Sequence, residues 1–365
     1  MFRDWFNRWV RENPTDIYRP AVIVGVVGGA VVAATMIVVW GQPYATASVQ
    51  TGPRGTGMSI TKFPGGETDP TVEANYTEAP YIPTGGEELA GAAYKNVQVL
   101  GDLTVDNFNR VMNAMTFWVA PEQGCAYCHG DGDMETYGSD DLYTKVVARR
   151  MIQMTQQLND DWGGHTNVSG EAGVTCFTCH RGANVPSNVW FRLDPVNEAA
   201  SGWSAVQNRV TRLSGSTSLP SDALPVLLAG EGAIKVHSLE PRAENAGSPT
   251  IQDAERTYAL MNYFANSLNV NCNFCHNSRA FNDTGQVTPQ WATALMGIDM
   301  VKSVNGEHLA PLAEVLPANR LGPVHGDAPK LACATCHKGY QKPLNGAHVI
   351  ADWPELAAPG APAYD

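Results

Sequence analysis

The sequence predicts a mainly α-helical protein with much irregular structure, two similar halves and one transmembrane helix near its N-terminus. Three observations support this prediction: four segments with helical spacing of apolar residues, a short cysteine motif after each segment, and an apolar run before all of them. The 35 glycines and 24 prolines are typical of long connecting segments without regular structure.

Four copies of Cys-x-x-Cys-His account for all eight cysteines of the chain. The motifs contain the cysteine pairs Cys125 and Cys128, Cys176 and Cys179, Cys272 and Cys275, and Cys333 and Cys336, followed by His129, His180, His276 and His337. Each pair can add across the two vinyl groups of one haem, and the histidine supplies an imidazole to the iron. Disulfides or zinc sites would not require a histidine after every pair. The sequence therefore predicts a tetrahaem c-type cytochrome with four covalently bound c-type haems.

Residues 20–40 are predicted to cross a membrane. The run from Ala21 to Trp40 is almost entirely apolar, and at about 1.5 Å per residue it spans roughly 30 Å, the thickness of a bilayer core. Arginines precede the run, and the next basic residue after it is Arg54. By the positive-inside rule, residues 1–19 are cytoplasmic and the haem-bearing part is periplasmic.

A cleaved signal peptide is the alternative, because Ala45-Thr46-Ala47 resembles a cleavage site. However, the apolar run is longer than the roughly 7–15 residues of a signal-peptide core. We therefore expect a retained membrane anchor.

The chain beyond the anchor divides into five parts. Residues 41–95 are rich in Pro, Gly and Thr and predict an extended periplasmic arm that could wrap a partner. A first dihaem half (96–190) and a second dihaem half (246–343) are joined by a connecting segment (191–245). Residues 344–365, which contain three prolines, predict a loose C-terminal tail.

One helix is expected ahead of each motif. The helices run from the N-cap Thr104 through Trp118, from Leu142 to Leu158, from about Ile251 to Leu268, and from Thr288-Pro289 through Met300. Val111-Met112-Asn113 in the first helix matches Leu260-Met261-Asn262 in the third. This match indicates that the two halves are a repeat.

The sixth ligand of each iron decides whether the site is closed, and it tunes the potential, since methionine raises the potential and a second histidine lowers it. Met112 and Met261 precede their motifs at intervals that let a helix cover one haem face while the motif returns on the other. Most helical methionines only fill the core. The repeated placement of these two favours ligation.

The spacing leaves the other two ligands open. Met151 and Met154 are both candidates for the second haem, and Met115 is expected to pack. The fourth motif has no methionine nearer than Met300, so its ligand comes from elsewhere. The remaining histidines are His165, His237, His308, His325 and His348.

Several runs carry a resemblance to a known family. They are Trp118 to Cys125, Ala148-Arg149-Arg150-Met151, Gly173 to Gly182 and Leu309-Ala310-Pro311-Leu312. Over roughly Tyr94 to Leu344 the chain resembles the tetrahaem cytochrome subunit of the photosynthetic reaction centre of purple-type phototrophic bacteria.

The resemblance implies the axial ligands. It assigns Met112, Met151 and Met261 to the first three haems and makes the fourth bis-histidine, with His165 opposite His337. The chain departs from the family in three places: many relatives are lipoproteins without this helix, the segment from His165 to the second motif is longer, and Trp291 stands where arginine is expected. Loss of that charge could alter docking or the potential of a nearby haem.

By this resemblance the protein is an electron carrier and not an enzyme. It would pass electrons from a soluble periplasmic carrier to the photo-oxidised bacteriochlorophyll special pair, as a single-pass subunit in the photosynthetic (intracytoplasmic or inner) membrane. Its partners would be the reaction centre core subunits and a donor, either a soluble c-type cytochrome or a high-potential iron-sulfur protein, with no nucleic acid. The net charge of -12 favours a basic donor.

Two other functions remain as alternatives. One is a membrane-anchored respiratory tetrahaem cytochrome of the quinol dehydrogenase type, which the expected methionine ligands disfavour. The other is a multihaem enzyme such as a peroxidase, which needs an iron with an open position.

Overall fold

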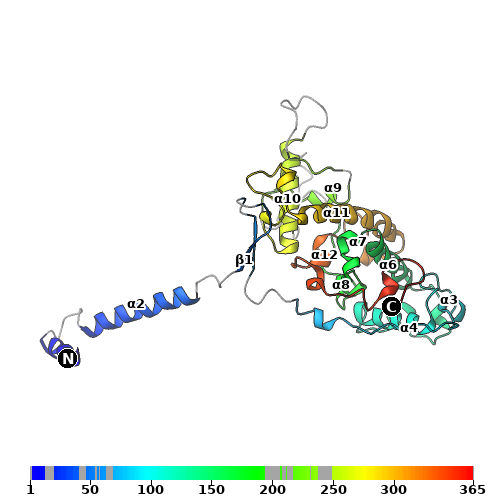
Figure 1. Ribbon diagram of the computed structural model, residues 1–365, viewed down its shortest axis with the longest axis horizontal. Coiled ribbons are helices and arrows are strands. Elements are labelled where there is room, and N and C mark those ends of the chain that lie inside the picture. The colour runs from blue at the N-terminus through cyan, green and yellow to red at the C-terminus, as the bar shows by residue number, and fades with distance from the viewer. Residues whose placement is uncertain are drawn as a thin grey trace. The chain divides into compact units, whose positions relative to one another are not determined.

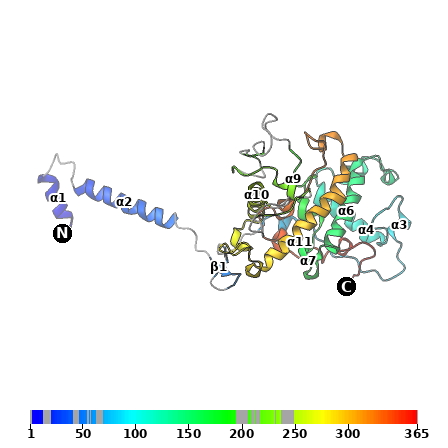
Figure 2. The same ribbon diagram turned by 90° about the horizontal axis from the view of Figure 1, so that it is seen from above.

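The computed structural model describes residues 2–12, 20–40, 47–53, 56, 58–62, 69–193, 206–207, 211, 217–230, 232–236 and 249–364. These belong to two compact units, of which one comprises Met1–Val49 and Thr61–Gly66 and the other comprises Gln50–Ile60 and Glu67–Asp365. Figures 1 and 2 show the elements of both units in two views.

The fold is mainly helical with long irregular segments, as predicted (Figure 1). The helices are α1 (Phe2–Glu12), α2 (Pro20–Trp40), α3 (Ala90–Ala93), α4 (Val105–Val119), α5 (Ala126–His129), α6 (Tyr143–Asp160), α7 (Gly163–Thr166), α8 (Cys176–His180), α9 (Ala223–Leu227), α10 (Ile251–Leu268), α11 (Pro289–Val304) and α12 (Cys333–His337). The strands β1 (Ala47–Gln50) and β2 (Ser59–Lys62) pair in a two-stranded sheet.

The N-terminal unit contains the predicted span and one helix that was not predicted. Within α2, Val22–Trp40 has a mean hydropathy of 2.7 with none of it buried, so it is long and apolar enough to cross a membrane. Residues 1–19 were expected only to be cytoplasmic. The structure forms α1 there, because its apolar residues recur at helical spacing.

The four long helices before the motifs form where they were predicted. Thr104 caps α4, and its hydroxyl accepts the N–H of Asn107 at 3.4 Å. At the start of α10, Thr250 and Asp253 form a reciprocal capping box. Pro289 occupies the first turn of α11, where a missing N–H costs no helical hydrogen bond.

Two short motif helices lie in contact at the centre of the haem-bearing unit. α8 packs on α4, α12 packs on α10, and α8 also contacts α12. Around this centre, α6 contacts α7 and α8, and α11 contacts α7. The arrangement brings motifs that are far apart in the sequence next to each other (Figures 1 and 2).

The C-terminal segment is not a loose tail, so that expectation was wrong. Leu344, Trp353 and Leu356 are buried in the cluster that α4 and α8 form, and the Trp118 ring meets that of Trp353 edge-on at 4.6 Å. Pro354 begins a short helical turn here, and the large apolar side chains around it keep the segment packed because their burial removes surface from water.

A buried ion pair holds this segment to α4. The Arg110 guanidinium lies 2.6 Å from the Glu355 carboxylate, and both side chains are fully buried. The Tyr364 hydroxyl donates to the same carboxylate at 3.1 Å, and Arg110 lies 4.1 Å from the centre of the Trp353 ring.

Residues 69–89, at the C-terminal end of the predicted arm, pack against α4 of the same chain. The Tyr76 ring stacks on Phe117 at 4.6 Å. The Asn107 side chain exchanges two hydrogen bonds with the backbone of Tyr81, at 2.9 and 2.7 Å. Little regular structure forms between residues 69 and 89, as predicted, and this part covers α4 rather than extending freely.

We predict that Glu355→Ala destabilises the protein strongly, because it leaves a buried guanidinium without its counter-charge. Breaking one partner of a buried pair costs about 3–5 kcal/mol. Thermal unfolding of the haem-loaded protein, followed by circular dichroism, should show a large fall in the melting temperature. Glu122→Ala, at an exposed position, is the control. Equal melting temperatures for the two variants would contradict the importance of this pair.

Candidate haem-binding sites

The cysteine motifs form short helical turns, and those of the first, second and fourth motifs end directly after their histidines. The first, second and fourth motifs form α5, α8 and α12, and the third forms a tight turn over Cys272–Phe274. Arg181 and Lys338, which follow the second and fourth histidines, have positive φ angles of 48° and 52°. A left-handed residue there stops the helix and turns the chain away, so each histidine stands at a free end.

The second and fourth motifs are held by matching hydrogen bonds. The N–H of Gly182 donates to the Trp118 carbonyl on α4 at 2.8 Å, and the N–H of Gly339 donates to the Ser267 carbonyl on α10 at 2.9 Å. In this way each motif turn is attached to the long helix that carries the Val-Met-Asn or Leu-Met-Asn triplet.

Two buried asparagines position the chain just before these motifs. Asn159, at the end of α6, accepts the Val174 N–H at 2.8 Å and donates to the Val174 carbonyl at 2.9 Å. Asn305, just after α11, makes the same pair of bonds to Leu331, both at 2.9 Å. Val174 and Leu331 each stand two residues before a motif. Both asparagines therefore tie a motif to the helix that precedes it.

The first and third motifs share a different contact. The Thr144 hydroxyl donates to the Tyr127 carbonyl at 2.6 Å, and the Thr288 hydroxyl donates to the Phe274 carbonyl at 2.7 Å. Each threonine stands at the beginning of the helix that follows its motif. The repeat therefore extends to side-chain contacts in both motifs of each half.

Four imidazoles are oriented by backbone carbonyls. The Nδ1–H groups of His129, His180 and His337 donate to the carbonyls of Tyr137, Ala183 and Tyr340 at 3.3, 2.8 and 3.0 Å. The His165 Nδ1–H donates to the Thr293 carbonyl at 2.9 Å. Because a carbonyl only accepts, Nδ1 carries the proton and Nε2 keeps its lone pair. This is the tautomer in which Nε2 binds a metal.

Burial also keeps these rings neutral. It lowers the pKa of His337 to about 4, and it lowers the pKa values of His165 and His180 as well. A protonated imidazole has no lone pair to offer to iron. The sites are therefore suited to ligation at neutral pH.

A cavity of about 990 Å³ contains the residues expected around the first two haems. Its lining includes Met112 with the first motif and Met151 with the second, and also Met115 and Met154. The volume lies near the upper end of about 300–1,000 Å³ for ligand pockets. With thioether donors, imidazoles and paired thiols in one apolar space, these residues have the chemistry that c-type haem requires.

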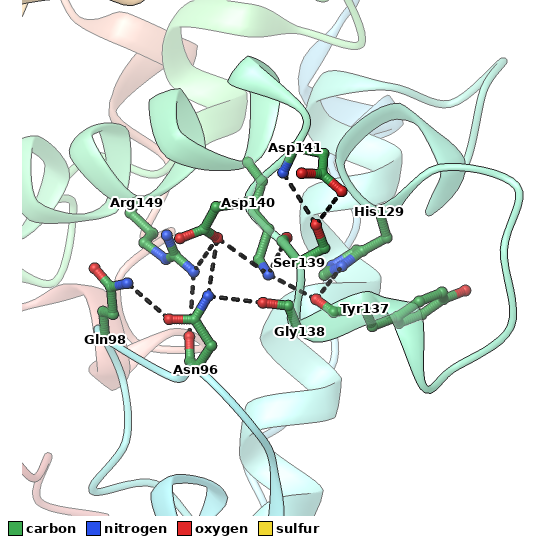
Figure 3. Close-up of polar contacts among 10 residues, drawn as sticks. Asn96, Gln98, His129, Tyr137, Gly138, Ser139, Asp140, Asp141 and Arg149 are labelled. Atoms are coloured by element: carbon green, nitrogen blue, oxygen red, sulfur yellow. Dashed lines mark hydrogen bonds and ion pairs between the residues drawn. The ribbon is translucent and has the colours of Figure 1, made fainter.

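The loop after the first motif is fixed to α6 by a polar network (Figure 3). The Lys145 ammonium donates to the Tyr137 carbonyl at 2.6 Å, and the Tyr137 ring stacks on His129 at 4.5 Å. The Asp140 carboxylate accepts from Arg149 and Asn96 at 2.8 and 3.0 Å, and these bonds hold its pKa well below the usual range. This network holds the carbonyl that orients His129.

His165 lies against α11 and faces the fourth motif. Its ring centre is 6.3 Å from that of His337, with the ring planes at 73°. A Cβ at Gly297 would stand only 2.5 Å from the His165 ring, so the close approach of α7 to α11 requires glycine there.

The other histidines have different surroundings. The His308 side chain bonds to Gln157, exposed His348 lies 3.4 Å from Glu171, and His325 is exposed. His237 lies outside the described residues. Of the four candidates that lie within the described residues, His165 is the one that the structure brings to His337.

The third motif differs from the other three in how its histidine is held. The His276 ring lies 5.3 Å from Phe281, and its Nδ1 is buried without a hydrogen-bond partner among the described residues. Met261 is half-buried on α10, packed against the larger core cluster.

The thiols of the second and fourth motifs touch. A hydrogen bond between Cys179 and Cys336 lowers the pKa of Cys179 and raises that of Cys336. Burial raises the pKa values of the Cys176 and Cys333 thiols to about 12. The cysteine side chains of the second and fourth motifs therefore lie close to one another.

Sequence reasoning did not find Asn159, Asn305, Thr144, Thr288 or Gly297. Each acts through a partner distant in the sequence, and the loops around the equivalent pairs differ in length. No fixed spacing therefore marks them.

Four Cys-x-x-Cys-His motifs, three of whose imidazoles are held through Nδ1, define the class of protein as a c-type cytochrome. Residues 41–357 match the model of the family described as "Photosynthetic reaction centre cytochrome C subunit". The chain belongs to this family.

Relatives that carry the name photosynthetic reaction center cytochrome c subunit cover most of the chain. That of Roseobacter denitrificans is 62% identical over the full length of both proteins. That of Rubrivivax gelatinosus is 40% identical over 94% of this chain and 92% of its own. That of Thermochromatium tepidum is 44% identical over 73% of this chain and 64% of its own.

Proposed function

We propose that this protein carries electrons through four covalently bound c-type haems, from a soluble periplasmic carrier to the photo-oxidised special pair of a photosynthetic reaction centre. Family membership supports the reaction centre role over the respiratory one. The observation that carries the proposal is that the first and second motifs line one cavity and the second and fourth are in contact, so haems bound there would form a continuous path. The haems supply the redox change, and the chain's residues orient, space and shield them.

The proposed axial pairs are His129 with Met112, His180 with Met151, His276 with Met261, and His337 with His165. The shared cavity supports the first two pairs. The Met154 side chain is buried in the core, with 9% of its surface exposed, whereas Met151 is only half-buried and packs against the edge of the core. This difference favours Met151 as the ligand. The facing rings of His165 and His337 support the last pair.

The haems would lie in two pseudo-symmetric halves in the order first, second, fourth, third. The first and second motifs share a cavity, and the second and fourth touch through α8 and α12. Helix α11 links the fourth motif to the third. It contacts α7, which carries His165, and Thr288 at its N-terminus bonds to Phe274 of the third motif. Matching bonds at Asn159 and Asn305 support the two-fold repeat.

In this proposal α2 spans the photosynthetic membrane with residues 1–19 in the cytoplasm and the haem-bearing unit in the periplasm. The length and hydropathy of α2 and the preceding arginines support this orientation. The core subunits of the reaction centre would be permanent partners. A soluble c-type cytochrome or a high-potential iron-sulfur protein would be the transient donor.

Flash spectroscopy on membranes tests the donor role. After a flash, c-type haem should be oxidised as the special pair is re-reduced. A deletion strain should lose this fast phase, and the gene supplied in trans should restore it. Unchanged recovery in the deletion strain, with no substitute donor present, would exclude the proposed function.

A pair of methionine variants tests the ligand assignment. Met112→His should keep the first iron six-coordinate and move one haem to a markedly lower potential, because axial ligands tune haem potentials over about 0.8 V. Met115→Leu, one turn away in the same cavity, should leave all potentials nearly unchanged. Redox titration decides between them. Equal shifts would show that the helix register is wrong.

The bis-histidine site is tested at His165 and at the glycine behind it. His165→Met should raise the potential of one haem and abolish its bis-histidine EPR signal. Gly297→Ala should displace the ring and weaken the same signal, because the new Cβ has no room. Gly306→Ala, with nothing within 4 Å of a new Cβ, is the matched control. If the signal survives His165→Met and is lost in His308→Met, His308 is the ligand.

A further inference from the structure

Helix α1 separates its residues into an apolar and a charged face. Its apolar residues recur at i, i+3, i+4, i+7 and i+8, and they are Phe2, Trp5, Phe6, Trp9 and Val10. The remaining positions are polar or charged. Among the described residues none of α1 is buried, and Phe2 and Trp5 are 66% and 52% exposed with their rings 5.7 Å apart. An aromatic surface of this kind is costly to leave in water.

The position of α1 in the chain restricts what can cover this face. Only residues 13–19 separate α1 from α2, and seven residues reach at most about 25 Å. If α2 spans the bilayer, α1 cannot move far from the membrane surface at which α2 begins. The two helices are also in contact within their unit.

The composition of α1 favours lipid over a neighbouring protein helix. Transmembrane helices pack on one another through small residues, and α1 has none. Instead it combines tryptophan and phenylalanine on one face with Arg3, Arg8 and Arg11 on the other. Aromatic rings occupy the headgroup level of bilayers, and arginine binds phosphate with two parallel hydrogen bonds.

We infer that α1 is an interfacial helix that lies in the plane of the membrane and binds anionic phospholipid. Its aromatic face enters the boundary between headgroups and acyl chains, and its arginines contact lipid phosphates. The inference rests on the proposed anchor but does not depend on electron transfer. It gives the chain a second attachment to the bilayer, beside the transmembrane helix.

Hydrogen exchange of the full-length, haem-loaded protein in nanodiscs tests this inference. One set of discs contains phosphatidylglycerol mixed with phosphatidylcholine, and the other contains phosphatidylcholine alone. An isolated helix of this length is marginal in water, so amides of residues 2–12 exchange quickly when α1 is detached. They should be protected in the anionic discs and less protected in the neutral ones.

Variants on the charged face show whether the arginines act as proposed. Each arginine near an anionic surface strengthens binding about fivefold, so Arg8→Gln should speed exchange by about that factor. Asn7→Gln, on the same face and without a change of charge, is the control and should leave exchange unaltered. Phe6→Asn should release α1 in both lipids, because it places an amide in the apolar face.

Three results would overturn the inference. Fast exchange of residues 2–12 in both kinds of disc would show that lipid does not hold α1. Protection that appears only in the intact reaction centre complex would assign the face to a protein partner. Fast exchange of residues 22–40 would show that α2 does not span the bilayer, and the inference would then have no basis. The electron-transfer role would be unaffected, because the flash experiment tests it separately.

Discussion

An imidazole can bind iron only through an unprotonated ring nitrogen, and at four histidines of this structure backbone carbonyls leave Nε2 as that nitrogen. At His129, His165, His180 and His337 a backbone carbonyl takes the Nδ1 proton, so the lone pair is left at the other nitrogen. Those carbonyls are themselves fixed. The Tyr137 carbonyl also accepts from Lys145, and the Thr293 carbonyl belongs to a regular helix that Gly297 allows to approach closely. Ring orientation thus depends on the contacts that fix each carbonyl as well as on the carbonyl itself.

The contact between α8 and α12 organises the two halves around each other. It brings the Cys179 and Cys336 thiols together. The segments on either side of these two motifs also form hydrogen bonds with one another. Trp190, after the second motif, forms a pair of backbone hydrogen bonds with Lys330, just before the fourth. Ile350, after the fourth motif, bonds to Ala172, just before the second. These reciprocal bonds link the segments that flank the second motif to the segments that flank the fourth.

Charge is distributed differently at the two ends of the chain. The protein as a whole is acidic, but the residues before α2 are rich in arginine. In the haem-bearing unit, buried cations are neutralised locally, as Arg110 is by Glu355 and Arg181 is by Asp69 at 2.6 Å. Such pairs stabilise little over apolar residues but tolerate no loss of one partner. They therefore fix where the C-terminal segment and the end of the arm attach.

The sequence by itself determined the class of cofactor, the candidate membrane span and the long helices, because these depend on local pattern. Cys-x-x-Cys-His is a contiguous motif, and apolar periodicity identifies α4, α6, α10 and α11 without knowledge of their neighbours. The same holds for residues 20–40, which form a helix long and apolar enough to cross a membrane.

Only the tertiary structure decided which distant groups meet. Spacing left five histidines open for the fourth haem, and folding brings His165 to His337 because α7 packs on α11. The expected loose C-terminus is buried because Trp353 and Glu355 find partners on α4, more than two hundred residues away. Asn159 and Asn305 do equivalent work at unequal distances from their motifs. Pairing across loops of variable length leaves no periodic trace in a sequence, so the physical contact itself was needed to find it.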